Sequence, residues 1–140
     1  MLIEDTDDWF AQDDSGTVWY FGEEVDNYSK GKLKDHAGSW EAGVDGAMPG
    51  IVMQARPTVG ASYRQEYYFG EAEDAAEVVE VGLTITTPYG TFRDVIKIRE
   101  TTALEPDVLE FKFYAPDVGL IKVINETDDE EMNLIEIKRQ

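Results

Sequence analysis

The segment from residue 84 to residue 123 constrains the fold most strongly. It reads TITTPYGTFRDVIKIRETTALEPDVLEFKFYAPDVGLIKV, in which apolar and polar residues alternate in runs separated by turn residues. A period of two is typical of β-strands, whose successive side chains point to opposite faces of a sheet. Proline, glycine and aspartate at 88–90 and 116–119 are residues that turns favour. The segment therefore predicts an antiparallel sheet.

The same period continues through much of the chain and predicts further strands. Segment 75–81 could form a short helix by propensity, but its valines favour a strand. Roughly nine or ten short strands without a convincing helix predict an all-β antiparallel barrel or half-barrel, and the length predicts a single domain over residues 1–140. We expect a turn at Lys30-Gly31-Lys32 within segment 28–34, and the other strands at 8–12, 17–22, 34–41, 51–54, 63–69, 84–87, 92–101, 108–114, 119–125 and 132–138.

The charge balance is strongly acidic. Thirty acidic residues against twelve basic ones give a net charge of −18. A field of this sign repels phosphate backbones and anionic lipid surfaces, so we expect no nucleic-acid partner. Solubility is the simplest role of the charge, and attraction of cations is the alternative.

The residue types present limit metal sites to oxygen ligands. The chain has no cysteine and one histidine, which excludes thiolate and histidine-rich centres and leaves Ca²⁺ or Mg²⁺. The candidate ligands are Asp13, Asp14 and Glu23 (or Glu24), although the EF-hand spacing is not met. No apolar run is long enough for a membrane span, and no secretory leader follows Met1, so the chain as it stands would remain cytoplasmic.

No motif for a nucleophile elbow or a phosphate loop is present, so the sequence does not specify a reaction. A hydrolase that uses carboxylates, on ester or phosphoester substrates and with or without a divalent metal, is one hypothesis. Its candidate residues are His36 as a general base, Glu41 and Asp45 around a glycine-rich loop, and Glu66 in an aromatic strand, where burial would raise its pKa.

Aromatic residues give the second hypothesis, a binding module for a small or apolar ligand. In Trp19-Tyr20-Phe21 three rings follow one another, so both faces of the strand carry rings. One face must belong to the core, and the other is then an interface, a ligand cavity or a covered surface. The candidate ligand-binding residues are Trp19, Trp40, Tyr67 and Tyr114.

Several longer motifs resemble a family of uncharacterised bacterial extracytoplasmic proteins, often lipoproteins. The resemblance covers nearly the whole chain and implies a secreted or periplasmic β-rich fold, but no activity. The residues that carry it are Asp8-Trp9-Phe10-Ala11-Gln12-Asp13, Val18-Trp19-Tyr20-Phe21-Gly22-Glu23, GSWEAGVDGA at 38–47, YRQEY at 63–67, TPYGTF at 87–92 and YAPDVGL at 114–120.

Members of that family look longer at the N-terminus, with further strands before the Asp-Trp-Phe-Ala-Gln-Asp motif. Here Met1 lies only a few residues before this motif, so we expect an N-terminally truncated domain. Missing strands would leave an open sheet edge, and such an edge pairs readily with another chain. This predicts a homo-oligomer.

Overall fold

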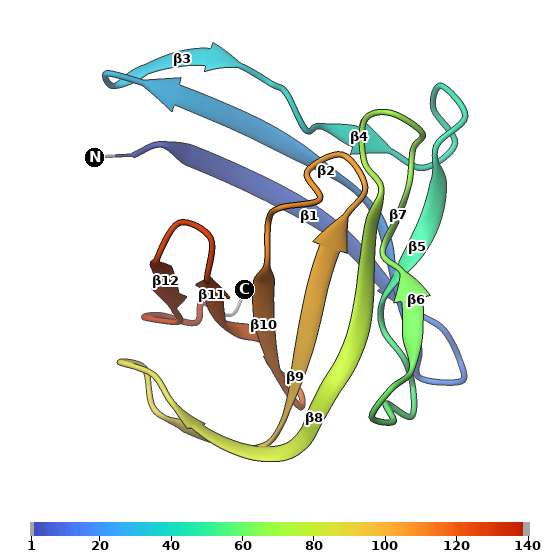
Figure 1. Cartoon of the computed structure of the whole chain (residues 1–140), viewed down its shortest axis with the longest axis vertical. Coiled ribbons are helices and arrows are strands. Elements are labelled where there is room, and N and C mark those ends of the chain that lie inside the picture. Colours follow the sequence, from blue (N-terminus) through green and yellow to red (C-terminus); the bar gives the residue numbers. More distant parts are fainter. Residues whose placement is uncertain (1, 139–140) are drawn as a thin grey trace. The chain divides into compact units, whose positions relative to one another are not determined.

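The computed structural model describes residues 2–138 and is all-β (Figure 1). No helix in this range is long and apolar enough to cross a membrane. The strands are β1 Glu4–Gln12, β2 Val18–Ser29, β3 Lys32–Asp35, β4 Trp40–Glu41, β5 Met48–Met53, β6 Ser62–Arg64, β7 Glu66–Tyr67, β8 Asp74–Thr86, β9 Thr91–Thr102, β10 Glu110–Ala115, β11 Gly119–Asn125 and β12 Glu130–Asn133.

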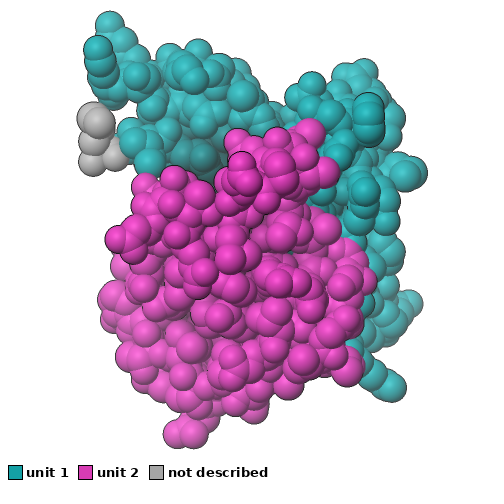
Figure 2. All heavy atoms as spheres, in the orientation of Figure 1, with its two compact units in different colours: residues 1–56, 64–74 teal, residues 57–63, 75–140 magenta. Residues whose placement is uncertain are grey.

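The chain divides into two compact units, coloured separately in Figure 2. Unit 1 contains Met1–Arg56 and Arg64–Asp74, and unit 2 contains Pro57–Tyr63 and Ala75–Gln140. The all-β class predicted from the sequence is confirmed. The strands form two six-stranded sheets, and their orders within residues 2–138 do not describe a closed barrel.

Sheet 1 is built on the long β1–β2 hairpin. Its order is β1-β2-β5-β7, and β3 and β4 also pair with β2. The ladder runs antiparallel from the pair Glu4 and Asn27 to the pair Gln12 and Val18, with an irregularity between Trp9 and Phe10. The predicted hairpin over these two strands is therefore confirmed.

The core of unit 1 lies against one face of this sheet. Tyr20 is 8% exposed, and its ring stacks on Phe10 and meets Trp40 edge-on at 5.2 Å between ring centres. The Tyr20 hydroxyl donates to Oδ1 of Asp8 at 2.6 Å. Burial first, and then the negative charge of Glu23 and Asp8, raises the pKa of Tyr20 far above its usual value. Tyr20 therefore acts as a neutral core residue.

Sheet 2 has the order β12-β11-β10-β9-β8-β6. Its β8 is long and curved in Figure 1, and it merges the two strands expected at 75–81 and 84–87. One face carries a core cluster, which the partly buried Phe92, Phe111 and Leu134 extend. The buried members of this cluster are Val95, Phe113, Ala115 and Ile121.

A buried ion pair lies on the opposite face of sheet 2, because Lys112 and Phe113 are neighbours on β10. The Lys112 ammonium is 2.6 Å from Oε1 of Glu100 and 3.3 Å from Oε1 of Glu110. The Glu100 side chain is 7% exposed and that of Lys112 is 25% exposed. Burial by itself would lower the pKa of Lys112, but the charges of Glu100, Tyr114 and Glu110 outweigh it and raise that pKa well above its usual value.

β1 and β2 extend well beyond the expected 8–12 and 17–22, and three other expected strands correspond poorly to the structure. Segment 63–69 is not one strand, because Gln65 interrupts it between β6 in sheet 2 and β7 in sheet 1. Segment 34–41 contains turns between the short strands β3 and β4. The final strand lies at Glu130–Asn133, earlier than the expected 132–138, because the acidic residues after the turn pair with β11.

Candidate functional site

The candidate site is an aromatic hollow on the face of sheet 1 opposite Tyr20. Because side chains alternate along β2, Trp19 and Phe21 project from this second face. Ala11 on β1 and Ile51 on β5 are the direct neighbours of Trp19 in the ladder. The hairpin and β5 therefore bring rings and small apolar groups from three strands to one place.

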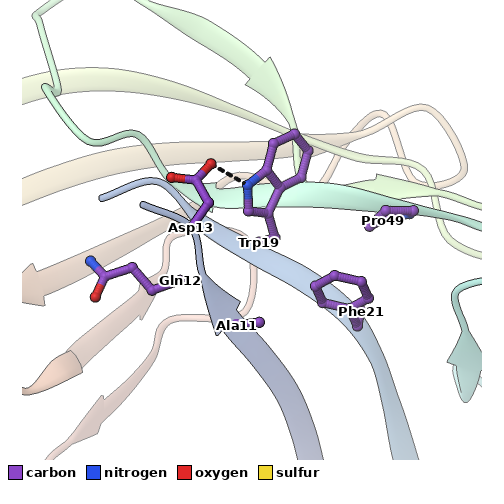
Figure 3. Close-up of a pocket in the computed structure, with 6 residues that line it drawn as sticks. All are labelled: Ala11, Gln12, Asp13, Trp19, Phe21 and Pro49. Carbon is purple, nitrogen blue, oxygen red and sulfur yellow. Dashed lines mark hydrogen bonds between the residues drawn. The ribbon is translucent and has the colours of Figure 1, made fainter. Parts of the chain in front are cut away.

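The hollow has a volume of about 390 Å³ and is open to solvent. Small-molecule sites typically range from about 300 to 1,000 Å³, so this one is at the small end. Phe21 is 39% exposed, which leaves much of its ring available for contact. The lining residues, drawn in Figure 3, are Ala11, Gln12, Asp13, Trp19, Phe21 and Pro49.

Asp13 fixes the orientation of the Trp19 ring. Figure 3 shows its carboxylate pointing toward the indole nitrogen, which donates to Oδ2 at 2.8 Å. Oδ1 accepts from the Ser15 hydroxyl at 2.6 Å and from the backbone N–H groups of Ser15 and Thr17 at 2.8 and 3.1 Å. The Ser15 and Trp19 side-chain hydrogen bonds lower the pKa of Asp13 to about 2. A carboxylate that stays ionised thus holds the ring in place.

Of the four predicted ligand-binding residues, the hollow contains Trp19. Trp40 lies in the core of unit 1 at 4% exposure. Tyr67 is on β7, where the Arg64 guanidinium lies 5.4 Å from its ring centre. Tyr114 is on β10 in unit 2. A ligand-binding role for these three residues stays a prediction.

The predicted metal ligands do not gather around one point. Asp13 is engaged by the turn and by Trp19, and Asp14 is exposed in that turn. Glu23 lies four residues beyond Trp19 on β2, roughly 13 Å farther along the strand at about 3.3 Å per residue. Among the described residues no group of three or more acidic or histidine side chains is placed to hold a metal ion.

The predicted catalytic residues lie at three places in unit 1. His36 Nδ1 is 2.8 Å from Oδ1 of Asp26 and 3.1 Å from the carbonyl oxygen of Val25. Glu41 and Asp45 are exposed, at the end of β4 and in the following loop. Glu66 is 7% exposed and accepts from the backbone N–H of Asp74 at 3.2 Å. The buried state expected for Glu66 is confirmed, whereas its part in a reaction stays a prediction.

The ligand-binding residues predicted from the sequence include Trp19 but not the other apolar residues that line the hollow. The signal for Phe21 was present, because two residues after Trp19 it must share the face of that ring. Ala11 and Pro49 gave no such signal, since their positions beside Trp19 depend on pairing between separate strands. Comparisons with protein-family models, curated proteins and solved structures each gave no match to this chain.

Proposed function

We propose that this protein is a non-enzymatic binding module, and that the aromatic hollow takes a small molecule with a flat apolar ring. The observation that carries the proposal is the half-buried ring of Trp19 beside the exposed ring of Phe21, both on the face of the β1–β2 hairpin opposite the buried Tyr20. Rings on a solvent-facing sheet surface bury apolar area and stack on flat ligands. The small volume favours one ring system over an extended ligand.

The charge of the protein favours a cationic or neutral ligand over an anionic one. The net charge is −18, and Asp13 adds an ionised group at the edge of the hollow. Cations are also attracted to the face of an indole ring. A ligand that combines an aromatic ring with an ammonium group therefore matches both the shape and the field of this site.

Three probes share the indole ring system and differ in charge: the cation tryptamine, the neutral 3-methylindole and the anion indole-3-propionate. We expect tryptamine to bind most tightly and indole-3-propionate most weakly, measured by chemical-shift changes in the Ala11 and Trp19 signals. Phe21→Ala should weaken tryptamine binding about fivefold, because one aromatic contact is lost.

Tyr89→Ala is the matched control, since Tyr89 is an exposed ring of unit 2 at 49% exposure. It should leave tryptamine binding unchanged. Equal weakening by both variants, or binding of all three probes without shifts at the hollow, would contradict the proposal.

A hydrolase is the second candidate, and the hydrogen-bonded pair of His36 and Asp26 favours it. A carboxylate at Nδ1 orients an imidazole so that Nε2 can accept a proton. If this is correct, turnover in a screen of ester and phosphoester substrates should fall at least 100-fold in His36→Ala. Equal activity in His36→Ala and the original protein would eliminate His36 as the base. Loss of turnover when EDTA is added would indicate that a divalent ion takes part.

We propose that the module works in the bacterial cell envelope and that its strands are arranged as in a barrel. The support is the resemblance described above, whose motifs are concentrated in the residues of the β1–β2 hairpin. A homo-oligomer remains part of this proposal, and light scattering after size exclusion measures it directly.

A further inference from the structure

We propose that the free edge of β1 binds an extended, basic segment of a partner protein by adding it to sheet 1 as a strand. This surface runs along the whole of β1 and meets the aromatic hollow only at Ala11 and Gln12, and the inference goes beyond the proposed function. β1 is nine residues long and is the terminal strand of its sheet. Eight of its nine residues are exposed, and the ninth, Thr6, is half-buried. Such an edge is a template for another strand.

The backbone direction along β1 follows from one hydrogen bond. The N–H of Tyr28 donates to the carbonyl oxygen of Ile3 at 2.8 Å. Hydrogen-bonded pairs alternate along an antiparallel ladder, so the backbone groups of Asp5 and Asp7 point toward β2. Those of Thr6 and Asp8 then point away from the sheet. The outward N–H and C=O groups of β1 are therefore positioned to form hydrogen bonds with a partner strand.

The first half of this edge is acidic on both faces of the sheet. Acids lie directly opposite acids in three pairs: Asp5 with Asp26, Asp7 with Glu24 and Asp8 with Glu23. Like charges at this spacing destabilise a sheet. The arrangement costs folding stability unless a positive partner neutralises it. His36 contacts one of these acids, with Nδ1 at 2.8 Å from Oδ1 of Asp26.

The second half of the edge is apolar. Trp9 and Phe10 are 42% and 51% exposed, on opposite faces, and Ala11 follows. An antiparallel partner strand would therefore carry apolar residues first, opposite Trp9 to Ala11, and lysine or arginine afterwards, opposite Asp8 to Glu4. Charge complementarity selects this partner over a second copy of the chain, which would bring another −18 charge and a second acidic strand.

The probe is the peptide Thr-Val-Tyr-Val-Lys-Lys-Thr-Lys-Lys, and its counterpart with every lysine replaced by glutamate is the control peptide. We expect the basic peptide to bind, and to bind more weakly as salt increases over about 0.05 to 0.5 M. On binding, the amide protons of Thr6 and Asp8 should become protected from hydrogen exchange. Those of Asp5 and Asp7 should already be protected in the free protein.

Two variants separate strand addition from general charge attraction. Asp5→Lys with Asp7→Lys should weaken peptide binding roughly tenfold or more, because like charges then meet across the new pair. It should also raise the melting temperature, since two acid–acid pairs disappear, so a loss of binding cannot come from unfolding. Glu80→Lys with Glu105→Lys changes the net charge equally at exposed positions of unit 2 and should leave binding within about twofold.

Thr6→Pro removes an outward N–H and leaves the β1–β2 ladder bonded, so it should also weaken binding. The proposal is overturned if neither salt nor sequence of the peptide matters, or if both double variants bind alike. It is also overturned if binding leaves Thr6 and Asp8 unprotected. Protection of these amides in a dimer without peptide would assign the edge to a second copy instead.

Discussion

Replacing Gly50 with alanine is expected to destabilise unit 1 by about 3 kcal/mol, at the upper end for overpacking. A Cβ atom at this position would lie 1.9 Å from the carbonyl oxygen of Gln65 and 2.9 Å from the N atom of Glu66. Both contacts are with backbone, which cannot rotate away as a flexible side chain can. Gln65 is itself 3% exposed, and its N–H donates to the carbonyl oxygen of Asp74.

Tryptophan fluorescence during chemical unfolding measures this effect specifically. All three tryptophans, at positions 9, 19 and 40, belong to unit 1, so the signal reports on that unit. Gly90→Ala in unit 2 is the control, followed by far-UV circular dichroism because the tryptophans do not report on that unit; a Cβ at Gly90 meets nothing within 4 Å and its backbone is not in the left-handed region. It should change stability by less than about 0.5 kcal/mol. A similar small effect for Gly50→Ala would refute the close approach of the two backbones.

Lys112→Met is expected to destabilise unit 2 by about 3 kcal/mol at pH 7. The change removes the ammonium partner from a carboxylate that is 7% exposed. Glu100 Oε2 already has no hydrogen-bond partner among the described residues, so the whole charge would be left uncompensated. Because a buried unpaired carboxylate takes up a proton more readily, the deficit should shrink as the pH falls toward 5.

The double variant with Glu100→Leu and Lys112→Met distinguishes loss of charge compensation from loss of packing. Replacing both partners with apolar groups should restore most of the stability, to within about 1 kcal/mol of the original. Far-UV circular dichroism during unfolding is the measurement, since unit 2 has no tryptophan. If the double variant is as unstable as Lys112→Met, the ion pair does not explain the loss.

The same ion pair sets a limit on stability at high pH. The pKa of Lys112 in the folded protein is raised well above its usual value. Its contribution is therefore complete below the unfolded-state value of about 10.4 and is lost as the pH rises through the folded value. Lys112→Met should show a correspondingly smaller loss of stability between pH 9 and 12.

Local residue patterns were sufficient to predict most individual strands. The strand at 119–125 matches β11, and the hairpin around the Asp13 turn and the extended state of 75–81 are confirmed. These features depend on neighbours in sequence: side-chain alternation, β-branched residues and turn residues. The same alternation predicts that Trp19 and Phe21 lie on one face of the strand and Tyr20 on the other. This prediction identified Trp19 as a residue of the hollow.

The sequence by itself determined that this chain forms strands, where it turns, and that its surface is acidic. Only the tertiary structure decided which strands pair. It divided segment 63–69 between two sheets and placed Gln65 against Gly50. It also brought Ala11 and Pro49 to Trp19 and left β1 at an edge. The physical reason is that alternation fixes the face of each side chain locally, whereas pairing depends on contacts between residues far apart in the chain.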